Sequence, residues 1–161
     1  MTVNLWRIAA DESTFTADSL SGKGAEISGG RWNRPGTPVL YTASNVSLAA
    51  METLVHFNAA LLPLNRILVR IEVPKDVWKK RIVADPASLP VGWDVVPPGM
   101  VTLDFGDQWL RSGASALLQV PSAIVPEEYN VLINPRHPAM AKGAIKAIKE
   151  RRWHYDSRLR S

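Results

Sequence analysis

Residues 67–74 read Ile-Leu-Val-Arg-Ile-Glu-Val-Pro, and this stretch decides the fold class of the chain. Its β-branched residues fall at every second position, which is the spacing of a β-strand with one buried face. Pro74 ends the pattern, because proline lacks the amide hydrogen that a sheet ladder needs. Shorter runs of the same kind occur at residues 4–8, 38–42, 115–120, 130–133 and 153–155. The sequence therefore predicts a mixed β-sheet core.

Two further segments have helical spacing. The clearer one takes Ser44 or Asn45 as its N-cap and runs to about Ala59, with apolar residues three and four positions apart. The second is predicted over residues 139–150, with two isoleucines inward and three lysines outward. No repeat, low-complexity tract or long linker interrupts the chain. We expect residues 1–161 to form a single domain.

The composition excludes several classes of protein. The chain has 161 residues, of which 46% are apolar and 21% charged, enough for one compact domain with a sizeable core. It contains no cysteine, so disulfides, thiolate nucleophiles and cysteine-based metal sites are excluded. The first ten residues lack the pattern of a signal peptide, and no apolar run reaches the roughly 18 residues that a membrane span requires. We expect a cytoplasmic protein without a membrane partner.

The formal net charge of +4 is concentrated at the C-terminal end of the chain. Residues 142–161 contain seven lysines and arginines but only two acidic residues, whereas the rest of the chain is close to neutral. This basic tail is either a solvated face or a contact for nucleic acid. No zinc-finger, RNP or helix-turn-helix pattern accompanies it, so we expect no direct nucleic-acid binding.

The common catalytic motifs are absent, and three short features remain. There is no GxGxxG, P-loop, HExxH or GxSxG pattern, but residues 29–33 read Gly-Gly-Arg-Trp-Asn, and Tyr41 and Glu52 follow. Paired glycines let a backbone approach a ligand closely, and a guanidinium offers forked donors for phosphate oxygens. Arg31 is therefore a candidate pyrophosphate ligand. The alternative is a turn whose arginine pairs with a surface acid.

Glu52 is a carboxylate whose neighbours on the clearer predicted helix are mostly apolar side chains. Such a residue is tolerated when it is ion-paired or when it serves a function. The arginines that could form a structural ion pair with it are Arg7, Arg31 and Arg70. His56, one helical turn later, is expected to be structural.

Ser122 follows a predicted strand, at a point where a hydroxyl can reach a ligand. The same hydroxyl could instead cap the turn after Pro121. Local sequence does not separate these two roles.

Taken together, these stretches resemble the RES domain, a family named for an Arg, a Glu and a Ser, whose members are toxins of toxin–antitoxin pairs. The matching pieces cover nearly the whole chain: LWRIA at 5–9, GGRWN at 29–33, YTA at 41–43, AAMETLVHF at 49–57, VPSAIVPEEYNVLINPRHP at 120–138 and YDSRL at 155–159. The family's named positions fall on Arg31, Glu52 and Ser122, with Tyr41 as the usual aromatic partner. None of the four is substituted.

The resemblance implies an α+β fold similar to the ADP-ribosyltransferases, with NAD⁺ as substrate and with neither a metal nor a prosthetic group. It also implies an Xre-type helix-turn-helix antitoxin as partner, and a homodimer of the toxin within that complex. The catalytic set implied is Arg31, Tyr41, Glu52 and Ser122. The set implied to contact NAD⁺ is Arg7, Arg31, Asn33, Tyr41 and Asn130.

The implied reaction breaks the bond between nicotinamide and ribose. Positive charge develops on the ribose as the bond breaks, so a carboxylate such as Glu52 would stabilise the transition state more than the ground state. The group that then attacks the ribose could be water, phosphate or a protein side chain, and the sequence does not choose among them.

Two functions of other classes compete with this hypothesis. One is a nucleic-acid-binding or ribonuclease toxin that uses the basic tail, whose binding should fall steeply with salt. The other is a catalytically silent interaction domain. The intact set of candidate catalytic residues favours the enzyme.

Overall fold

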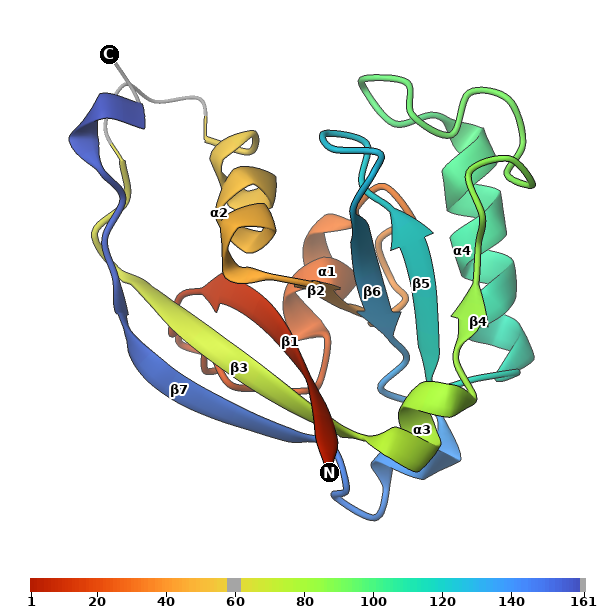
Figure 1. Cartoon of the computed structure of the whole chain (residues 1–161), viewed down its shortest axis with the longest axis horizontal. Coiled ribbons are helices and arrows are strands. Elements are labelled where there is room, and N and C mark those ends of the chain that lie inside the picture. Colours follow the sequence, from red (N-terminus) through yellow and green to blue (C-terminus); the bar gives the residue numbers. More distant parts are fainter. Residues whose placement is uncertain (58–61, 160–161) are drawn as a thin grey trace.

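The computed structural model describes residues 1–57 and 62–159, and its named strands form one seven-stranded sheet in the order β4-β5-β6-β2-β1-β3-β7 (Figure 1). The strands are β1 (Thr2–Ala9), β2 (Leu40–Ala43), β3 (Arg66–Pro74), β4 (Ile82–Val83), β5 (Leu117–Pro121), β6 (Tyr129–Ile133) and β7 (Lys146–Trp153). Neighbouring strands are antiparallel except for the parallel pair β4 and β5. The predicted mixed sheet and α+β class are confirmed.

The central prediction, a strand over residues 67–73, is also confirmed. Val69, Ile71 and Val73 of β3 are completely buried in one apolar cluster. Leu68, on the opposite face, is buried against the helix that follows β2. One face of β3 is therefore buried from Val69 to Val73, and the other face is buried at Leu68.

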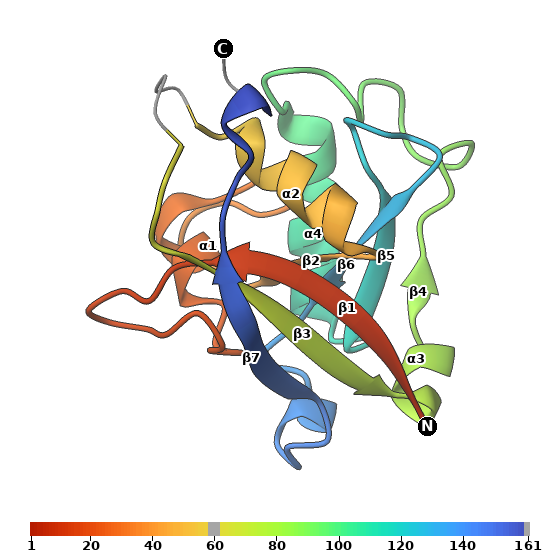
Figure 2. The same cartoon turned by 60° about the vertical axis from the view of Figure 1, so that its left-hand side comes forward.

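The sheet opens between β1 and β2. β1 pairs with β3 along its whole length, but only one registered pair, Trp6 opposite Ala43, joins β1 to β2. The strands β7, β3 and β1 consequently run at a different angle from β5 and β6 (Figures 1 and 2). Side chains at the C-terminal end of β1 can therefore face the space between the two halves of the sheet.

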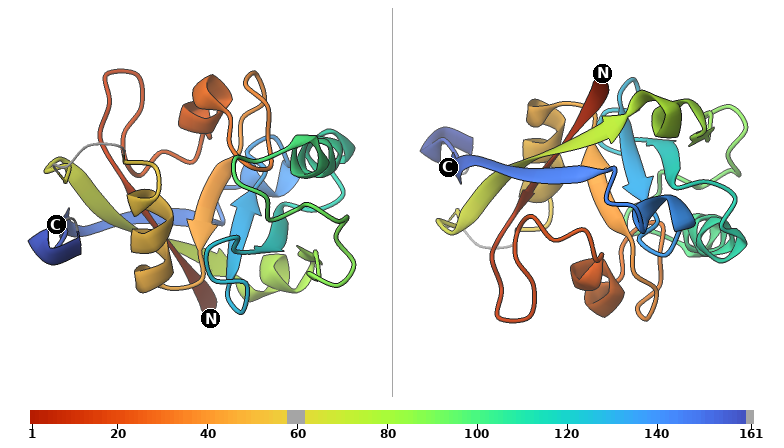
Figure 3. Two further views of the ribbon diagram at one scale, coloured as in Figure 1. Left: turned by 90° about the horizontal axis from the view of Figure 1, so that it is seen from above. Right: turned by 90° about the horizontal axis from the view of Figure 1, so that it is seen from below.

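Four α-helices are present in the described residues: α1 (Lys23–Ser28), α2 (Val46–Leu54), α3 (Lys75–Lys79) and α4 (Met100–Ser112). Two short 3-10 turns occupy Pro138–Met140 and Ser157–Leu159. Residues of α2 pack with those of β1 and β3, whereas residues of α4 pack with those of β5 and β6, so the two helices lie over different halves of the sheet (Figure 3). None of the described helices combines the length and apolarity needed to cross a lipid bilayer.

The predicted helix after Ser44 begins as expected but ends earlier. Asn45 is its N-cap, because the Asn45 side chain accepts a hydrogen bond from the amide of Leu48 at 2.8 Å. The helix ends at Leu54 rather than near Ala59, and the last predicted residues, from 58 onward, lie outside the described residues.

The helix predicted over residues 139–150 is wrong. A 3-10 turn ends at Met140, Gly143 has a left-handed φ of 64°, and β7 begins at Lys146. β7 pairs with β3 from Glu72 to Arg66, so hydrogen bonds to a neighbouring strand outweigh the local helical spacing. Two of the outward lysines, Lys146 and Lys149, lie on this edge strand, where charges discourage pairing with other chains, whereas Lys142 lies in the turn before it.

Helix α4 was not predicted from the sequence. Val101, Phe105 and Trp109 recur four residues apart, and Gly113 adopts the left-handed conformation with φ of 62° that ends many helices. These signals were readable but interrupted by Gly106, which weakens a helical pattern.

Candidate active site

Three elements converge on Glu52, which lies in the last turn of α2. Oε1 of Glu52 accepts a hydrogen bond of 2.7 Å from the hydroxyl of Ser122, the first residue after β5. The same oxygen accepts a second bond of 2.7 Å from Nδ2 of Asn130 in β6. Within the described part of the chain, Oε2 makes no hydrogen bond. One carboxylate oxygen is therefore fixed, and the other is available.

Ser122 caps the turn after β5, which is one of the two roles that the sequence left open, and it also binds Glu52. Its side chain is completely buried, and its hydroxyl oxygen accepts bonds of 3.1 Å from the amides of Ile124 and Val125. It thus caps the turn after β5 while donating its proton to Glu52. Its hydroxyl hydrogen is already committed to the carboxylate.

The alternative of a structural ion pair for Glu52 is wrong for the described residues, which contain no cation within ion-pair distance of it. Arg70 pairs instead with Glu72 and Glu150. Burial lowers the pKa of Arg31, and attraction to Glu52 partly opposes that shift. Arg31 and Glu52 therefore lie near enough to interact electrostatically without neutralising each other.

Arg31 belongs to the loop at residues 29–33, and its guanidinium is held by a second loop. Nη1 of Arg31 donates to the carbonyls of Trp93 at 3.0 Å and Val95 at 2.8 Å, so a loop more than 60 residues away orients this side chain. The close backbone approach that Gly30 permits is to Tyr41, because a Cβ there would lie 2.7 Å from the Tyr41 hydroxyl oxygen.

Tyr41 and Asn33 hold the same loop in shape. The Tyr41 hydroxyl accepts a bond of 3.0 Å from the amide of Trp32 and donates one of 2.6 Å to Oδ1 of Asn33. Asn33 is completely buried, and its Nδ2 donates to the carbonyls of Ala25 and Thr37. Burial raises the pKa of Tyr41, which keeps the phenol protonated. The side-chain polar atoms of both residues are bonded within the protein.

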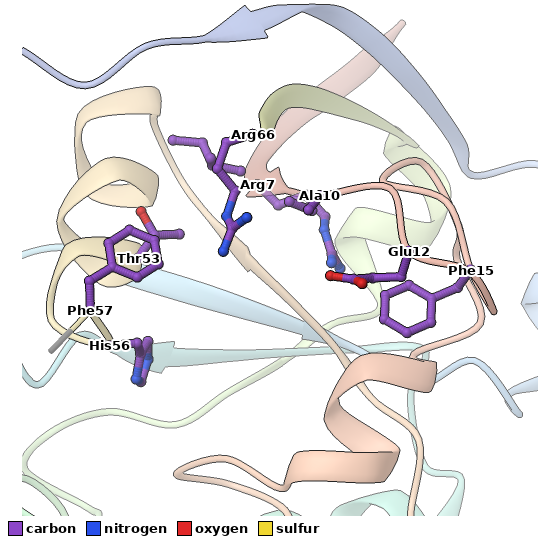
Figure 4. Close-up of a pocket in the computed structure, with 10 residues that line it drawn as sticks. Arg7, Ala10, Glu12, Phe15, Thr53, His56, Phe57 and Arg66 are labelled. Atoms are coloured by element: carbon purple, nitrogen blue, oxygen red, sulfur yellow. The ribbon is translucent and has the colours of Figure 1, made fainter. Parts of the chain in front are cut away.

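Arg7 lies in a pocket of about 220 Å³ that is lined by the end of β1 and the segment after it, by residues at and after the end of α2, and by the start of β3 (Figure 4). The polar and aromatic residues that line it include Arg7, Glu12, Thr53, His56, Phe57 and Arg66. Nε of Arg7 is buried without a hydrogen-bond partner, and Arg7 has no ion pair among the described residues. Burial lowers its pKa to about 10. Burial of a charged guanidinium without a counter-charge costs free energy, and a bound anion would offset that cost. Arg7 is therefore a candidate anion-binding residue.

Several residues around the site carry no local signal in the sequence. The carbonyls of Trp93 and Val95 contact Arg31 only through tertiary structure, and Arg66 reaches the pocket from the start of β3. His56, expected to be structural, is exposed at the edge of the pocket. The described residues contain no group of three or more His, Asp or Glu side chains that could hold a metal ion.

Sequence comparison finds clear relatives. The family model described as the RES domain matches residues 4–156. The chain is 57% identical over 159 residues to the Prs ADP-ribosylating toxin of Sphingobium sp., a match that covers 99% of this chain and 98% of the relative. It is 36% identical over 146 residues to Toxin Res of Yersinia enterocolitica, covering 91% of this chain and 93% of that one.

Structural comparison finds the same fold in a distant protein. A chain of the crystal structure of the MbcT–MbcA toxin–antitoxin complex of M. tuberculosis superposes with a TM-score of 0.66, covering 94% of this chain and 85% of the other. The two sequences are only 16% identical, so this match concerns the fold alone.

Proposed function

The chain belongs to the RES domain family, and from this premise we propose that it is the toxin of a toxin–antitoxin pair and cleaves the nicotinamide–ribose bond of NAD⁺. The observation that carries the proposal is the arrangement of Glu52. Its Oε1 is fixed by Ser122 and Asn130, while its Oε2 has no hydrogen bond within the described residues. A pre-oriented carboxylate with one free oxygen suits a reaction in which positive charge develops on a sugar.

The proposed bond cleavage proceeds with nicotinamide as leaving group. Nicotinamide departs with the electron pair of the C–N bond and becomes neutral, while the ribose carbon becomes positively charged. Oε2 of Glu52 stabilises that charge more strongly than it stabilises bound NAD⁺. Ser122 and Asn130 act as positioning residues, because their donors already bind Glu52.

Two arginines supply positive charge for the diphosphate of NAD⁺. Arg7 has an uncompensated guanidinium in the pocket, and a phosphate there would offset its desolvation. Arg31 uses Nη1 for two carbonyls, which leaves its other donors for the substrate. Tyr41 and Asn33 contribute by shaping the loop that presents Arg31, since their side-chain polar atoms are bonded to each other and to the backbone.

The acceptor we propose is a side chain of a target protein. The support is the Sphingobium relative, which is 57% identical along nearly the whole chain and is named as an ADP-ribosylating toxin of Prs. In this reaction a nucleophilic side chain of Prs bonds to the ribose carbon and gives up a proton, and nicotinamide is released. Water and phosphate are the competing acceptors.

The proposed inhibitor is an Xre-type helix-turn-helix antitoxin. This partner follows from the resemblance to the RES family, and the fold neighbour from M. tuberculosis was itself solved as a toxin–antitoxin complex.

The decisive experiment incubates purified protein with NAD⁺, with and without phosphate and with and without purified Prs, and identifies the products by mass spectrometry. We expect nicotinamide release together with a mass increase of Prs by one ADP-ribose. Nicotinamide together with free ADP-ribose, and no change in the mass of Prs, would assign hydrolysis. Nicotinamide together with a phosphorylated ADP-ribose would assign phosphorolysis. Intact NAD⁺ in every mixture would refute the proposal.

A further inference from the structure

Helix α4 touches the 29–34 loop through a glycine. Gly106 lies so close to that loop that a Cβ on it would come within 1.7 Å of the carbonyl oxygen of Trp32. A glycine inside a helix costs stability, so a close packing contact is the physical reason for its presence here. The Trp32 ring also meets Phe105 of α4 edge to face, with ring centroids 5.8 Å apart.

The next residue of α4, Asp107, binds both the side chain and the backbone of Arg34 in this loop. Asp107 is 5% exposed, and its carboxylate accepts bonds from Arg34 Nη1 at 2.7 Å and from the Arg34 backbone amide at 3.2 Å. The bond to Asp107 raises the pKa of Arg34. Asp104 bonds the same guanidinium at 2.7 Å, but its side chain is 65% exposed and does not reach the backbone. Of these two aspartates, Asp107 alone binds both the guanidinium and the backbone amide of Arg34 in the described residues.

We propose that Asp107 is a positioning residue for the reaction, because it fixes the segment that carries Arg31. The same segment donates a hydrogen bond to the Tyr41 hydroxyl. The segment from Gly30 to Arg34 is held on one side by Tyr41, through the Trp32 amide, and on the other by Asp107, through the Arg34 amide. Arg31 lies between these two anchors. This inference rests on the proposed role of Arg31 in binding NAD⁺.

Loosening one anchor should displace Arg31 while leaving the Glu52 arrangement unchanged. Ser122 directly follows β5, Asn130 lies in β6 and Glu52 in α2, and none of them contacts Asp107 through a hydrogen bond found in the described residues. A positioning role for Asp107 therefore predicts weaker NAD⁺ binding rather than a slower chemical step. A purely structural role predicts a loss of thermal stability with unchanged kinetic constants.

The test compares Asp107→Asn with Asp104→Asn. The second variant is a matched control, because it removes the charge of the exposed carboxylate that binds the same Arg34 guanidinium. Displacement of a binding group by about 1 Å can cost up to roughly 100-fold, so we expect kcat/KM for NAD⁺ to fall about 10- to 100-fold in Asp107→Asn, mainly through KM. Asp104→Asn should stay within about twofold of the wild type. Hydrogen–deuterium exchange of residues 29–37 should accelerate only in Asp107→Asn. Asp107→Glu, which restores the charge, should recover part of the affinity.

Two results would overturn the inference. One is an unchanged KM in Asp107→Asn despite faster exchange in residues 29–37, and the other is an equal effect of both substitutions. If Asp107→Asn melts without a cooperative transition, the comparison is made with Asp107→Glu, whose normal KM and faster loop exchange would equally contradict the proposal. Failure of the wild type to consume NAD⁺ would instead refute the proposed function, and the exchange rates would still decide whether Asp107 holds the loop.

Discussion

The Ser122 hydroxyl donates its 2.7 Å hydrogen bond to the same Glu52 oxygen that the side-chain amide of Asn130 binds, although Ser122 and Glu52 lie 70 residues apart in sequence. Because both donors bind Oε1, the carboxylate is held in one orientation, and Oε2 has no hydrogen bond within the described residues. This pairing connects two of the residues that the sequence named as candidates for the site.

Ser122→Ala should lower kcat for NAD⁺ cleavage with little change in KM, because it releases one of the two bonds that orient Glu52. It also leaves the amides of the half-buried residues Ile124 and Val125 without their acceptor, and the loss of these two hydrogen bonds should cost about 1–3 kcal/mol of stability. The measurements are steady-state kinetics and thermal unfolding.

The matched control for that substitution is Ser115→Ala. Ser115 is also buried, and its hydroxyl accepts a bond from the Trp109 ring nitrogen and donates one to the carbonyl of Leu117. This variant should lose comparable stability and keep its kcat. Equal losses of kcat in both variants would show that the effect of Ser122→Ala is structural.

Glu52→Gln should reduce NAD⁺ cleavage on the order of 10²- to 10³-fold, because it removes the charge at constant shape. The folded state should persist, since Glu52 is paired only with neutral donors in the described residues. Circular dichroism and an NAD⁺ consumption assay measure the two properties. Glu72→Gln, which removes a carboxylate paired with Arg70 on β3, is the control and should remain active. Full activity of a folded Glu52→Gln protein would remove Glu52 from the mechanism.

Arg7→Met should weaken NAD⁺ binding without lowering the melting temperature. The Arg7 guanidinium is desolvated and has no ion pair within the described chain, so replacing it by an apolar side chain of similar length removes a cost of folding. Arg70→Met is the control, because Arg70 pairs with Glu72 and Glu150, and its loss should not affect NAD⁺ affinity. A lower melting temperature with unchanged NAD⁺ affinity in Arg7→Met would assign Arg7 to the fold.

NAD⁺ affinity should also decline as the pH rises through about 10, the pKa of Arg7 in the free protein. A bound phosphate favours the charged guanidinium, so binding raises this pKa and is coupled to proton uptake above that pH. The stability contribution has the opposite sign: burial lowers the pKa of Arg7, so its charged form destabilises the fold below pH 10, and this cost disappears as the proton is lost. Calorimetric titration with NAD⁺ near pH 8 and pH 10.5, on wild type and Arg7→Met, measures the coupling. The wild type should lose more affinity than the variant, and parallel curves would contradict the assignment.

The complex with the antitoxin should be unable to bind NAD⁺. An acidic side chain or a C-terminal carboxylate of the antitoxin could occupy the phosphate position and pair with Arg31. Truncation of the antitoxin segment that reaches this position should restore activity even if the two proteins still associate. A complex that turns over NAD⁺ as fast as the free toxin would point to control from a distance.

Local patterns predicted the elements whose stability depends on neighbours in sequence. The alternation in residues 67–73 predicted β3, and Asn45 was one of the two predicted helix caps, because a strand face and a cap depend on residues two or three positions apart. The same reasoning failed for residues 139–150. Their helical spacing was real, but pairing with β3 supplied hydrogen bonds that no local pattern records.

The sequence by itself named Arg31, Tyr41, Glu52 and Ser122 as candidate site residues, through the resemblance of its motifs to the RES domain. Only the tertiary structure decided what each one touches. It placed the Ser122 hydroxyl within hydrogen-bond distance of Glu52, and the Arg31 guanidinium within hydrogen-bond distance of the carbonyls of Trp93 and Val95. It also left Arg7 without a counter-charge within the described residues. Motifs are sets of neighbours in the chain, whereas hydrogen bonds and desolvation depend on which distant segments the folded sheet brings together.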